Sequence, residues 1–375
     1  MSIQVLHAYR TYFPDPPGGV QQAIRQIALA TQVEGVKNTI FTLSPRPSPE
    51  LIELPEGVVH RSKSWASPAS CDLGGMQAVR RFRQLANSAD LLFLHFPWPF
   101  ADVLRLAAAK DRPSILLYHS DIVRQRLMGA AYAPLMWRTL RAVDCIIATS
   151  PAYAQSSSVL SHPLIRKKVR VIPLGIDDKS VGDDVDQKIF SRLALEESAP
   201  FFLFIGVLRY YKGLHYLIKA AEKLPARIVI AGSGPELSKL QKQAENEGSK
   251  KIIFAGQVND AEKRALYERC CAVVLPSHLR SEAFGMVLVE ASMYSKPLIS
   301  CEIGSGTSYV NSHGKTGFVV EPASPPALMN AMLTLLDNPE MTKVMGLAAR
   351  DRYKQFFSGA ALGTNYAQIF AELAR

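Results

Sequence analysis

Two glutamates stand eight positions apart in the stretch S-E-A-F-G-M-V-L-V-E-A-S, residues 281–292. If the whole stretch were helical, Glu290 would be rotated about 80° from Glu282 and displaced from it by about 12 Å. The two carboxylates could then share neither a proton nor a metal ion. They could instead bind opposite ends of one extended ligand, because a carboxylate can accept two hydrogen bonds from a vicinal diol.

Gly285 and the apolar run after it indicate that a helix begins between Phe284 and Met286. Glu282 then lies in a loop, and Glu290 lies one to two turns into the helix. The first N–H groups of a helix have no intrahelical partner and favour an anion. The arrangement fits a nucleotide-sugar, with the ribose diol on Glu290, the diphosphate near the helix start and sugar hydroxyls on Glu282. Two unrelated surface glutamates remain the alternative.

Further polar groups in the second half of the chain also follow predicted strands. Arg209 and Lys212 come just after one strand, in F-I-G-V-L-R-Y-Y-K-G-L-H, and two cations in such a loop suit a diphosphate. The next strand is followed by A-G-S-G-P-E, with Gly232 and Gly234. Asp260 is expected to cap a later helix. An ordinary surface loop is the alternative for each stretch.

The first half offers two comparable loops. Gly18 and Gly19 open a helix after the first strand, where an anion could bind, but the stretch is not the G-x-G-x-x-G of a dinucleotide site. His119 and Asp121 follow another strand, in Y-H-S-D. An isolated histidine is usually structural, yet its position at the carboxyl end of a strand equally favours ligand binding. A glycine turn without a ligand is the alternative for Gly18 and Gly19.

These loops require parallel sheets to position them. Short apolar runs alternate with amphipathic ones, which predicts an α/β fold of two doubly wound sheets. The expected strands cover 3–7, 38–43, 90–95, 114–119, 145–150 and 169–174, then 201–206, 227–232, 251–256, 272–277, 297–301 and 317–320. A polar, acidic stretch between them, from about 177 to 200, is the expected linker. Ligands of such sheets bind beyond the carboxyl ends of the strands.

The bulk composition is that of a globular protein. At 375 residues, with 48% hydrophobic and 20% charged residues, the chain predicts two domains. No apolar run reaches the roughly 18 residues of a membrane-spanning helix, and the N-terminus enters a strand without room for a signal peptide. The five cysteines form no C-x-x-C pair, so we expect reduced thiols in a cytoplasmic protein.

The net charge of +10 is concentrated in one region. Residues 61–170 hold 16 Lys+Arg and 6 Asp+Glu, a difference of +10, so the rest of the chain sums to zero. Clusters lie at Arg80, Arg81 and Arg83, and at 166–170. Anionic lipid and phosphorylated substrates are candidate partners, whereas no nucleic-acid motif is present and no nucleic acid is expected. A merely solvated basic surface is the alternative.

The stretch around Glu282 and Glu290 resembles the glutamate–seven–glutamate motif of the retaining GT-B glycosyltransferases of family 4. P-P-G-G-V, H-S-D, I-P-L-G-I-D, Y-K-G-L, A-G-S-G-P-E, L-P-S and G-K-T-G-F-V-V-E-P follow in the family's order and span almost the whole chain. The chain departs from the family in one loop, whose usual family sequence is G-R-L-x-x-x-K-G. Here Val207 follows Gly206 and the arginine comes at Arg209, so its role is open, whereas Lys212 matches.

The resemblance implies two Rossmann-like domains facing a cleft. It places an acceptor-binding domain at 1–178, a linker at 179–199, a nucleotide-sugar-binding domain at 200–350 and a helix at 351–375 that returns to the first domain. The implied catalytic residues are His119, Lys212 and Glu282. The implied donor-binding residues are Gly19, Arg209, Gly232, Gly234, Phe284, Gly285, Met286 and Glu290, with Gly18 and Asp121 auxiliary. No cofactor and no metal is implied, because cations and helix dipoles neutralise the diphosphate.

V-L-R-Y-Y-K-G-L and G-S-G-T-S-Y-V-N look most like bacterial O-antigen or exopolysaccharide mannosyltransferases. The resemblance implies retaining transfer of mannose from GDP-mannose to a lipid-linked oligosaccharide, giving an α-linkage, at the inner face of the inner membrane. A UDP-sugar donor, a GT-B epimerase or phosphorylase, and a non-catalytic nucleotide-sugar-binding protein are the alternatives. A nicotinamide or flavin oxidoreductase should carry G-x-G-x-x-G and an acidic residue about 20 positions on, and neither sheet supplies both.

Overall fold

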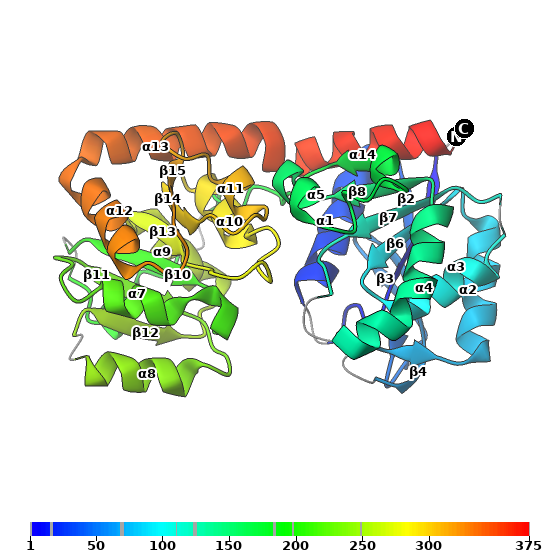
Figure 1. The fold of residues 1–375 in the computed structure, drawn as a ribbon, viewed down its shortest axis with the longest axis horizontal. Coiled ribbons are helices and arrows are strands. Elements are labelled where there is room, and N and C mark those ends of the chain that lie inside the picture. Colours follow the sequence, from blue (N-terminus) through cyan, green and yellow to red (C-terminus); the bar gives the residue numbers. More distant parts are fainter. Residues whose placement is uncertain are drawn as a thin grey trace. The chain divides into compact units, whose positions relative to one another are not determined.

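The computed structural model describes residues 2–15, 18–67, 71–109, 111–122, 126–182, 185–196, 199–247 and 250–374, with the backbone alone at 126–131. The chain forms two compact units (Figure 1). Unit 1 comprises residues 1–177 and 358–375, and unit 2 comprises residues 178–357. Each is built on its own largely or wholly parallel sheet, so the predicted α/β fold class is confirmed.

The sheet of unit 1 has the order β3-β4-β2-β1-β6-β7-β8-β9, with β5 paired to β4. Its strands are β1 (Gln4–Tyr9), β2 (Lys37–Ser44), β3 (Leu51–Leu54), β4 (Gly57–Ala66), β5 (Leu73–Gly74), β6 (Leu91–Phe96), β7 (Ser114–Tyr118), β8 (Cys145–Ala148) and β9 (Val169–Val171). All pairs are parallel except β3 with β4 and β4 with β5. The six strands predicted in this half are present, and the β3–β5 edge was not predicted.

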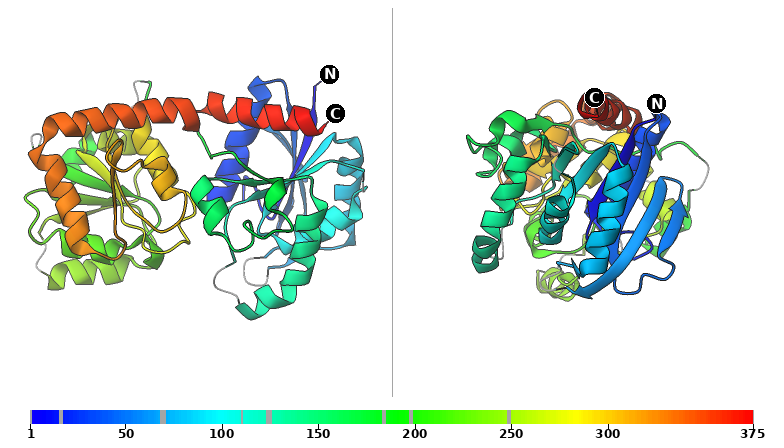
Figure 2. Two further views of the ribbon diagram at one scale, coloured as in Figure 1. Left: turned by 45° about the horizontal axis from the view of Figure 1, so that its top comes forward. Right: turned by 90° about the vertical axis from the view of Figure 1, so that its right-hand side faces the viewer.

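The helices of unit 1 connect these strands. They are α1 (Gly19–Val33), α2 (Met76–Ser88), α3 (Pro99–Ala107), α4 (Arg126–Ala142), α5 (Pro151–Ser156) and the short 3-10 helix η2 (Arg166–Lys168), followed at the end of the chain by α14 (Gly359–Leu373). The last helix packs across α1 (Figures 1 and 2). A Cβ atom at Gly363 would lie 2.5 Å from the Ala30 carbonyl oxygen, so the two helices approach closely only because this residue is glycine.

Unit 2 has a wholly parallel sheet of order β12-β11-β10-β13-β14-β15. Its strands are β10 (Phe201–Ile205), β11 (Arg227–Ala231), β12 (Ile252–Gly256), β13 (Ala272–Leu275), β14 (Leu298–Cys301) and β15 (Gly317–Val320). All six were predicted, because strands buried on both faces are near-continuous apolar runs. The order reverses between β10 and β13, which is the point where doubly wound sheets bind ligands.

The helices of unit 2 are α6 (Lys188–Arg192), η3 (Tyr210–Lys212), α7 (Leu214–Ala220), α8 (Leu237–Asn246), α9 (Asp260–Arg269), α10 (Met286–Met293), α11 (Thr307–Val310), α12 (Pro325–Asp337), α13 (Pro339–Arg352) and a π-helical turn, η4 (Tyr353–Phe357). The segment expected as a linker belongs to this unit. Phe190 of α6 lies under the Arg269 guanidinium, whose central carbon is 3.7 Å from the ring centroid. Residues 183–184 and 197–198 of that segment lie outside the described residues.

Candidate active site

The carboxyl end of β13 leads into the loop that carries Glu282, and α10 begins at Met286, within the predicted range. Gly285 makes this entry possible. It has φ of 88°, a left-handed conformation that side chains other than glycine rarely adopt. A Cβ atom there would also lie within 3.1–3.3 Å of Leu275, Leu288 and Thr307. Glu290 is consequently just over one turn into α10, as the spacing predicted.

Glu282 forms an ion pair with Lys212, which reaches it from η3 after β10. Only 12% of the lysine side chain and 11% of the glutamate side chain is exposed. The Ser277 hydroxyl donates to the same carboxylate oxygen at 3.4 Å. Burial by itself would lower the pKa of Lys212, but the adjoining carboxylate outweighs it and the pKa is raised. Lys212 is therefore held in its charged form beside Glu282, where the two loops meet.

The backbone turn after Lys212 is tight. Gly213 has φ of 70°, and a Cβ atom there would lie 2.1 Å from the Pro276 carbonyl oxygen. The loop after β10 thus touches the loop after β13, and this contact brings Lys212 to Glu282. Arg209 is exposed at the start of η3, and its positive charge opposes protonation of Lys212. The shifted arginine therefore stands near Lys212 in the same loop.

Glu290 is held by two residues of α9. The Tyr267 hydroxyl donates to Oε2 at 2.9 Å, and Lys263 Nζ lies 2.5 Å from the same oxygen. Tyr267 is fully buried, and burial followed by the neighbouring carboxylate raises its pKa well above the usual value, so its hydroxyl stays a donor. Neither residue was predicted, because a partner on the preceding helix has no signature in the spacing of the motif.

Gly232 and Gly234 have a structural reason to be glycine. A Cβ atom at Gly232 would lie 2.0 Å from the Gly206 carbonyl oxygen, and one at Gly234 would lie 2.5 Å from the Leu208 carbonyl oxygen. The Leu208 amide donates to the Ser233 carbonyl at 2.9 Å. The two loops are joined through their backbones, so these glycines fix the path of the loop that carries Arg209 and Lys212.

In unit 1, His119 directly follows β7 and is 8% exposed. Its Nε2 atom lies 3.2 Å from Nδ1 of His95, the next-to-last residue of the neighbouring strand β6. Burial lowers the pKa of His119 to about 3, so the imidazole is neutral at pH 7. Asp121 serves the adjoining loop: its carboxylate accepts from Tyr118 at 3.0 Å and from Ser157 at 2.6 Å.

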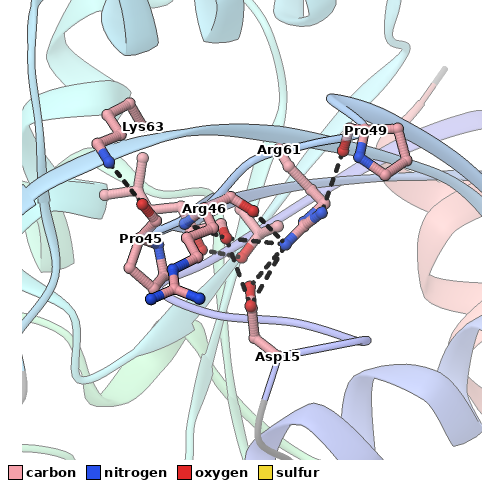
Figure 3. A network of polar contacts seen from close by, with 9 residues as sticks. Asp15, Pro45, Arg46, Pro49, Arg61 and Lys63 are labelled. Carbon is pink, nitrogen blue, oxygen red and sulfur yellow. Dashed lines mark hydrogen bonds and ion pairs between the residues drawn. The ribbon is translucent and has the colours of Figure 1, made fainter.

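Gly18 and Gly19 stand at the start of α1, as predicted, and a side chain at Gly19 would meet no atom within 4 Å. The loop before them is tied down by Arg61 of β4. Its guanidinium donates to Asp15 at 3.3 Å and 3.4 Å, to the Arg46 carbonyl at 2.9 Å and to the Pro49 carbonyl at 3.1 Å (Figure 3). The unpredicted strand β4 thereby positions the loop that leads to the start of α1.

Each unit gathers its own set of predicted residues. Unit 2 brings Arg209, Lys212, Glu282 and the start of α10 to the strand ends around β10 and β13, with Glu290 on α10; unit 1 holds His119 and Asp121 after β7. Within the described part of the chain, no group of three or more His, Cys, Asp or Glu side chains could hold a metal ion. All five cysteines are free thiols.

Known proteins resemble the chain over its whole length. Residues 17–180 match the family model described as Glycosyltransferase Family 4, and residues 185–352 match Glycosyl transferases group 1. The D-rhamnosyltransferase WbpZ of Pseudomonas aeruginosa is 43% identical over 95% of this chain and 92% of its own. The O-antigen chain mannosyltransferase C of Escherichia coli is 38% identical over 99% of both chains.

A solved structure of Anabaena HepE, in complex with UDP and glucose, matches with a TM-score of 0.78 over 99% of this chain and 100% of its own, at 19% sequence identity. At that identity the likeness concerns the fold. Two paired Rossmann-like units are thus a shared architecture, and the sequence relatives cover both.

Proposed function

Because this chain belongs to the GT-B glycosyltransferases, we propose that it transfers a hexose from a nucleotide-sugar to a lipid-linked glycan in bacterial O-antigen or related polysaccharide synthesis. The two relatives named above, of which one is an O-antigen chain mannosyltransferase, support this choice. The observation that carries the proposal is the buried Lys212–Glu282 pair at the strand ends of unit 2. A cation and a carboxylate side by side suit a ligand with phosphates next to hydroxyls.

In this proposal, Lys212 and Arg209 bind the diphosphate together with the N–H groups at the start of α10. Glu290, oriented by Tyr267, accepts from the ribose hydroxyls, and Glu282 accepts from sugar hydroxyls. The charge that develops on the leaving diphosphate is then neutralised by protein cations and helix N–H groups. No metal is required in this scheme. Loss of activity in EDTA, with recovery on adding a divalent ion, would contradict it.

The sugar is proposed to be mannose, carried by GDP. One relative transfers D-rhamnose, which is 6-deoxymannose, so a 6-deoxy donor is the second candidate. A pocket that hydrogen-bonds one hydroxyl discriminates strongly against the analogue that lacks it. Thermal-shift screening of GDP-mannose, GDP-D-rhamnose and UDP-sugars separates the donors, since a ligand of the native state raises the melting temperature.

The proposed reaction retains the anomeric configuration and yields an α-linkage. A covalent sugar ester on Glu282, as in retaining glycosidases, is the competing mechanism. We favour attack on the same face of the sugar, with the leaving phosphate taking the proton of the acceptor hydroxyl. An inverted product, or a glycosyl ester trapped on Glu282, would overturn this mechanism.

The acceptor is proposed to be lipid-linked and reached at an anionic membrane through unit 1. The structure describes no helix that is long and apolar enough to span a bilayer. Arg80, Arg81 and Arg83 are exposed on α2. Arg80 and Arg81 line a groove of about 390 Å³ together with Lys63 and Glu50. Each cation near an anionic surface contributes about 1 kcal/mol, so this cluster suffices for reversible attachment.

In the second predicted basic cluster, at 166–170, two of the cations bind groups within the protein. Lys168 donates to the carbonyls of Arg141 and Val143, and Arg170 forms two 2.6 Å hydrogen bonds with Glu372. Liposome co-sedimentation tests the attachment: the protein should bind anionic vesicles at low salt and detach as salt screens the charges. Reversing the charges of the α2 cluster should abolish binding. Equal binding to neutral vesicles would leave only a solvated basic surface.

Activity is tested with the donor that gives the largest thermal shift. Release of free nucleotide that depends on a lipid-linked acceptor identifies a transferase, whereas acceptor-independent conversion of the sugar identifies an epimerase. Arg209→Ala should lose activity together with Lys212→Ala if the shifted arginine serves the diphosphate. Full activity of Arg209→Ala would assign that role to another cation.

A further inference from the structure

Three histidines stand in a row across neighbouring strands of unit 1. Nδ1 of His7, in β1, lies 3.2 Å from Nε2 of His95, in β6. His95 Nδ1 lies 3.2 Å from His119 Nε2 in the same way. His7 and His95 are fully buried and His119 is 8% exposed. The row ends at Asn38 of β2, whose Oδ1 is 3.0 Å from His7 Nε2.

The orientation of Asn38 is fixed by its other contacts. Its Nδ2 donates to the Ala28 carbonyl at 2.9 Å and to Thr31 Oγ1 at 3.2 Å. The Ala28 carbonyl can only accept. The single Thr31 hydroxyl hydrogen is directed to the Ile27 carbonyl at 2.8 Å, so that oxygen also accepts from Asn38. If the Asn38 amide were flipped, its oxygen would face two other acceptors, the Ala28 carbonyl and Thr31 Oγ1.

This orientation sets the direction of the whole row. Because Asn38 presents its carbonyl oxygen, His7 Nε2 must carry a hydrogen and His7 Nδ1 must accept. His95 then donates through Nε2 and accepts through Nδ1, and His119 donates through Nε2. A neutral imidazole has one N–H, so His119 Nδ1 is left with its lone pair.

The protonation state is consistent with this assignment. Burial lowers the pKa of His7 to about 4 and that of His119 to about 3. The pKa of His95 is lowered well below its usual value by burial and by its two histidine neighbours. The aromatic rings of Phe93 and Tyr9 are also placed against His95, with centroids 4.6 Å and 6.3 Å away. The row is therefore neutral at pH 7 and each ring has one donor and one acceptor.

We propose that His7 and His95 are positioning residues that hold His119 as its Nε2–H tautomer, so that Nδ1 accepts a hydrogen bond from a substrate hydroxyl. The inference rests on the proposed function for the nature of the substrate, but not for the tautomer. A sugar hydroxyl is the kind of donor that such a nitrogen would select. A chain of neutral groups keeps this acceptor in place without adding a charge.

The tautomer is measured directly by long-range ¹H–¹⁵N correlation on protein with ¹⁵N-labelled histidine. The His119 signals, assigned by their loss in His119→Asn, should report a protonated Nε2 and an unprotonated Nδ1 at pH 7. A protonated Nδ1, or an imidazolium, would overturn the proposal. In His7→Phe, His95 Nε2–H loses its acceptor and the link to Asn38 is broken, so the second tautomer of His119 should become populated. This measurement decides the inference even if the protein turns over no nucleotide-sugar.

Kinetics then separate positioning from general packing. His7→Phe should lower kcat/KM on the order of tenfold in the wild-type background and leave it unchanged in His119→Ala, because coupled residues are not additive. His7→Gln, whose amide keeps one donor and one acceptor, should retain most of the activity. Tyr366→Phe is the control: its buried hydroxyl has no hydrogen-bond partner among the described residues, and its ring packs beside Phe93 in the same core. An equal loss from His7→Phe in both backgrounds would show a structural role only.

Discussion

Lys212→Met removes the cation from the buried pair with Glu282 while keeping a side chain of similar volume. Since 11% of the glutamate side chain is exposed, the carboxylate stays largely out of water, with the Ser277 hydroxyl at 3.4 Å in place of a cation. Removing one partner of a buried ion pair costs about 3–5 kcal/mol. For a unit as long as residues 178–357, each kcal/mol lowers the melting temperature by about 2–4 °C, so we expect a fall of about 6–20 °C.

The double variant Lys212→Met/Glu282→Gln removes both charges and should be more stable than Lys212→Met alone, because no charge is left buried without a partner. Urea and thermal unfolding of the four proteins at pH 7 give the coupling free energy. The raised pKa of Lys212 means that its contribution is complete below the pKa of an unfolded lysine and is lost as pH rises through the native value. The difference between wild type and Lys212→Met should therefore close in strong alkali. If the losses of the two single variants add up to the loss of the double variant, the coupling free energy is zero and a stabilising pair is refuted.

Three further outcomes are expected. Lys212→Ala should lower turnover by about 10²–10³-fold, the usual cost of losing one group that stabilises developing charge; a change in KM alone would contradict this. Tyr267→Phe removes the 2.9 Å hydrogen bond to Glu290 and should weaken nucleotide binding in calorimetry by about 1 kcal/mol, with turnover at saturating donor kept. Gly285→Ala should destabilise the protein more than Gly35→Ala, because both have positive φ but only Gly285 is crowded by side chains; equal unfolding free energies would point to backbone strain alone.

The sequence predicted the strands of unit 2 completely and the edge of unit 1 poorly, for one physical reason. Central parallel strands are buried on both faces, so their sequences are continuous apolar runs, as in β13 (Ala272–Leu275). By contrast, β4, which lies next to the edge strand β3, mixes polar and apolar residues and includes Arg61 and Lys63, which the sequence suggested were part of a basic surface. Arg61 is instead buried, where it holds the loop after β1 (Figure 3).

Local chemistry was predicted to within one residue where it depends on neighbours in the chain. Asp260 was expected as a helix cap, but Asn259 is the cap, and it forms a reciprocal capping box with Glu262. The prediction was wrong because both residue types cap well, and the reciprocal bond to the third helical residue decides between them.

The histidine row illustrates the larger gap. His119 was a candidate from its position after a strand, but its dependence on His7 and His95 was not foreseen. That dependence requires β6 to lie between β1 and β7, which is a property of strand order. His95 is the next-to-last residue of β6 and His119 follows β7, but His7 lies opposite Phe93 in the middle of β1, so the contacts depend on strand register as well as on strand order.

The two sets of candidate residues differ in a way that suits different tasks. The histidine row of unit 1 is uncharged, and its hydrogen bonds all run in one direction. The Lys212–Glu282 pair of unit 2 is an ion pair, in which a ligand phosphate could replace Glu282 as the partner of Lys212. If a diphosphate takes Lys212, Glu282 loses its cation and must find other donors, which the hydroxyls of an attached sugar supply and a free nucleotide does not. The whole donor should accordingly bind better than the free nucleoside diphosphate, which favours product release. In Glu282→Gln no carboxylate is left without a cation when a diphosphate binds Lys212. Calorimetry should therefore show that this variant binds the free nucleoside diphosphate more tightly than wild type does. The Kd of the whole donor and the Kd of the free nucleoside diphosphate should differ less in the variant than in wild type. An unchanged difference would mean that the pair stays intact when the ligand binds.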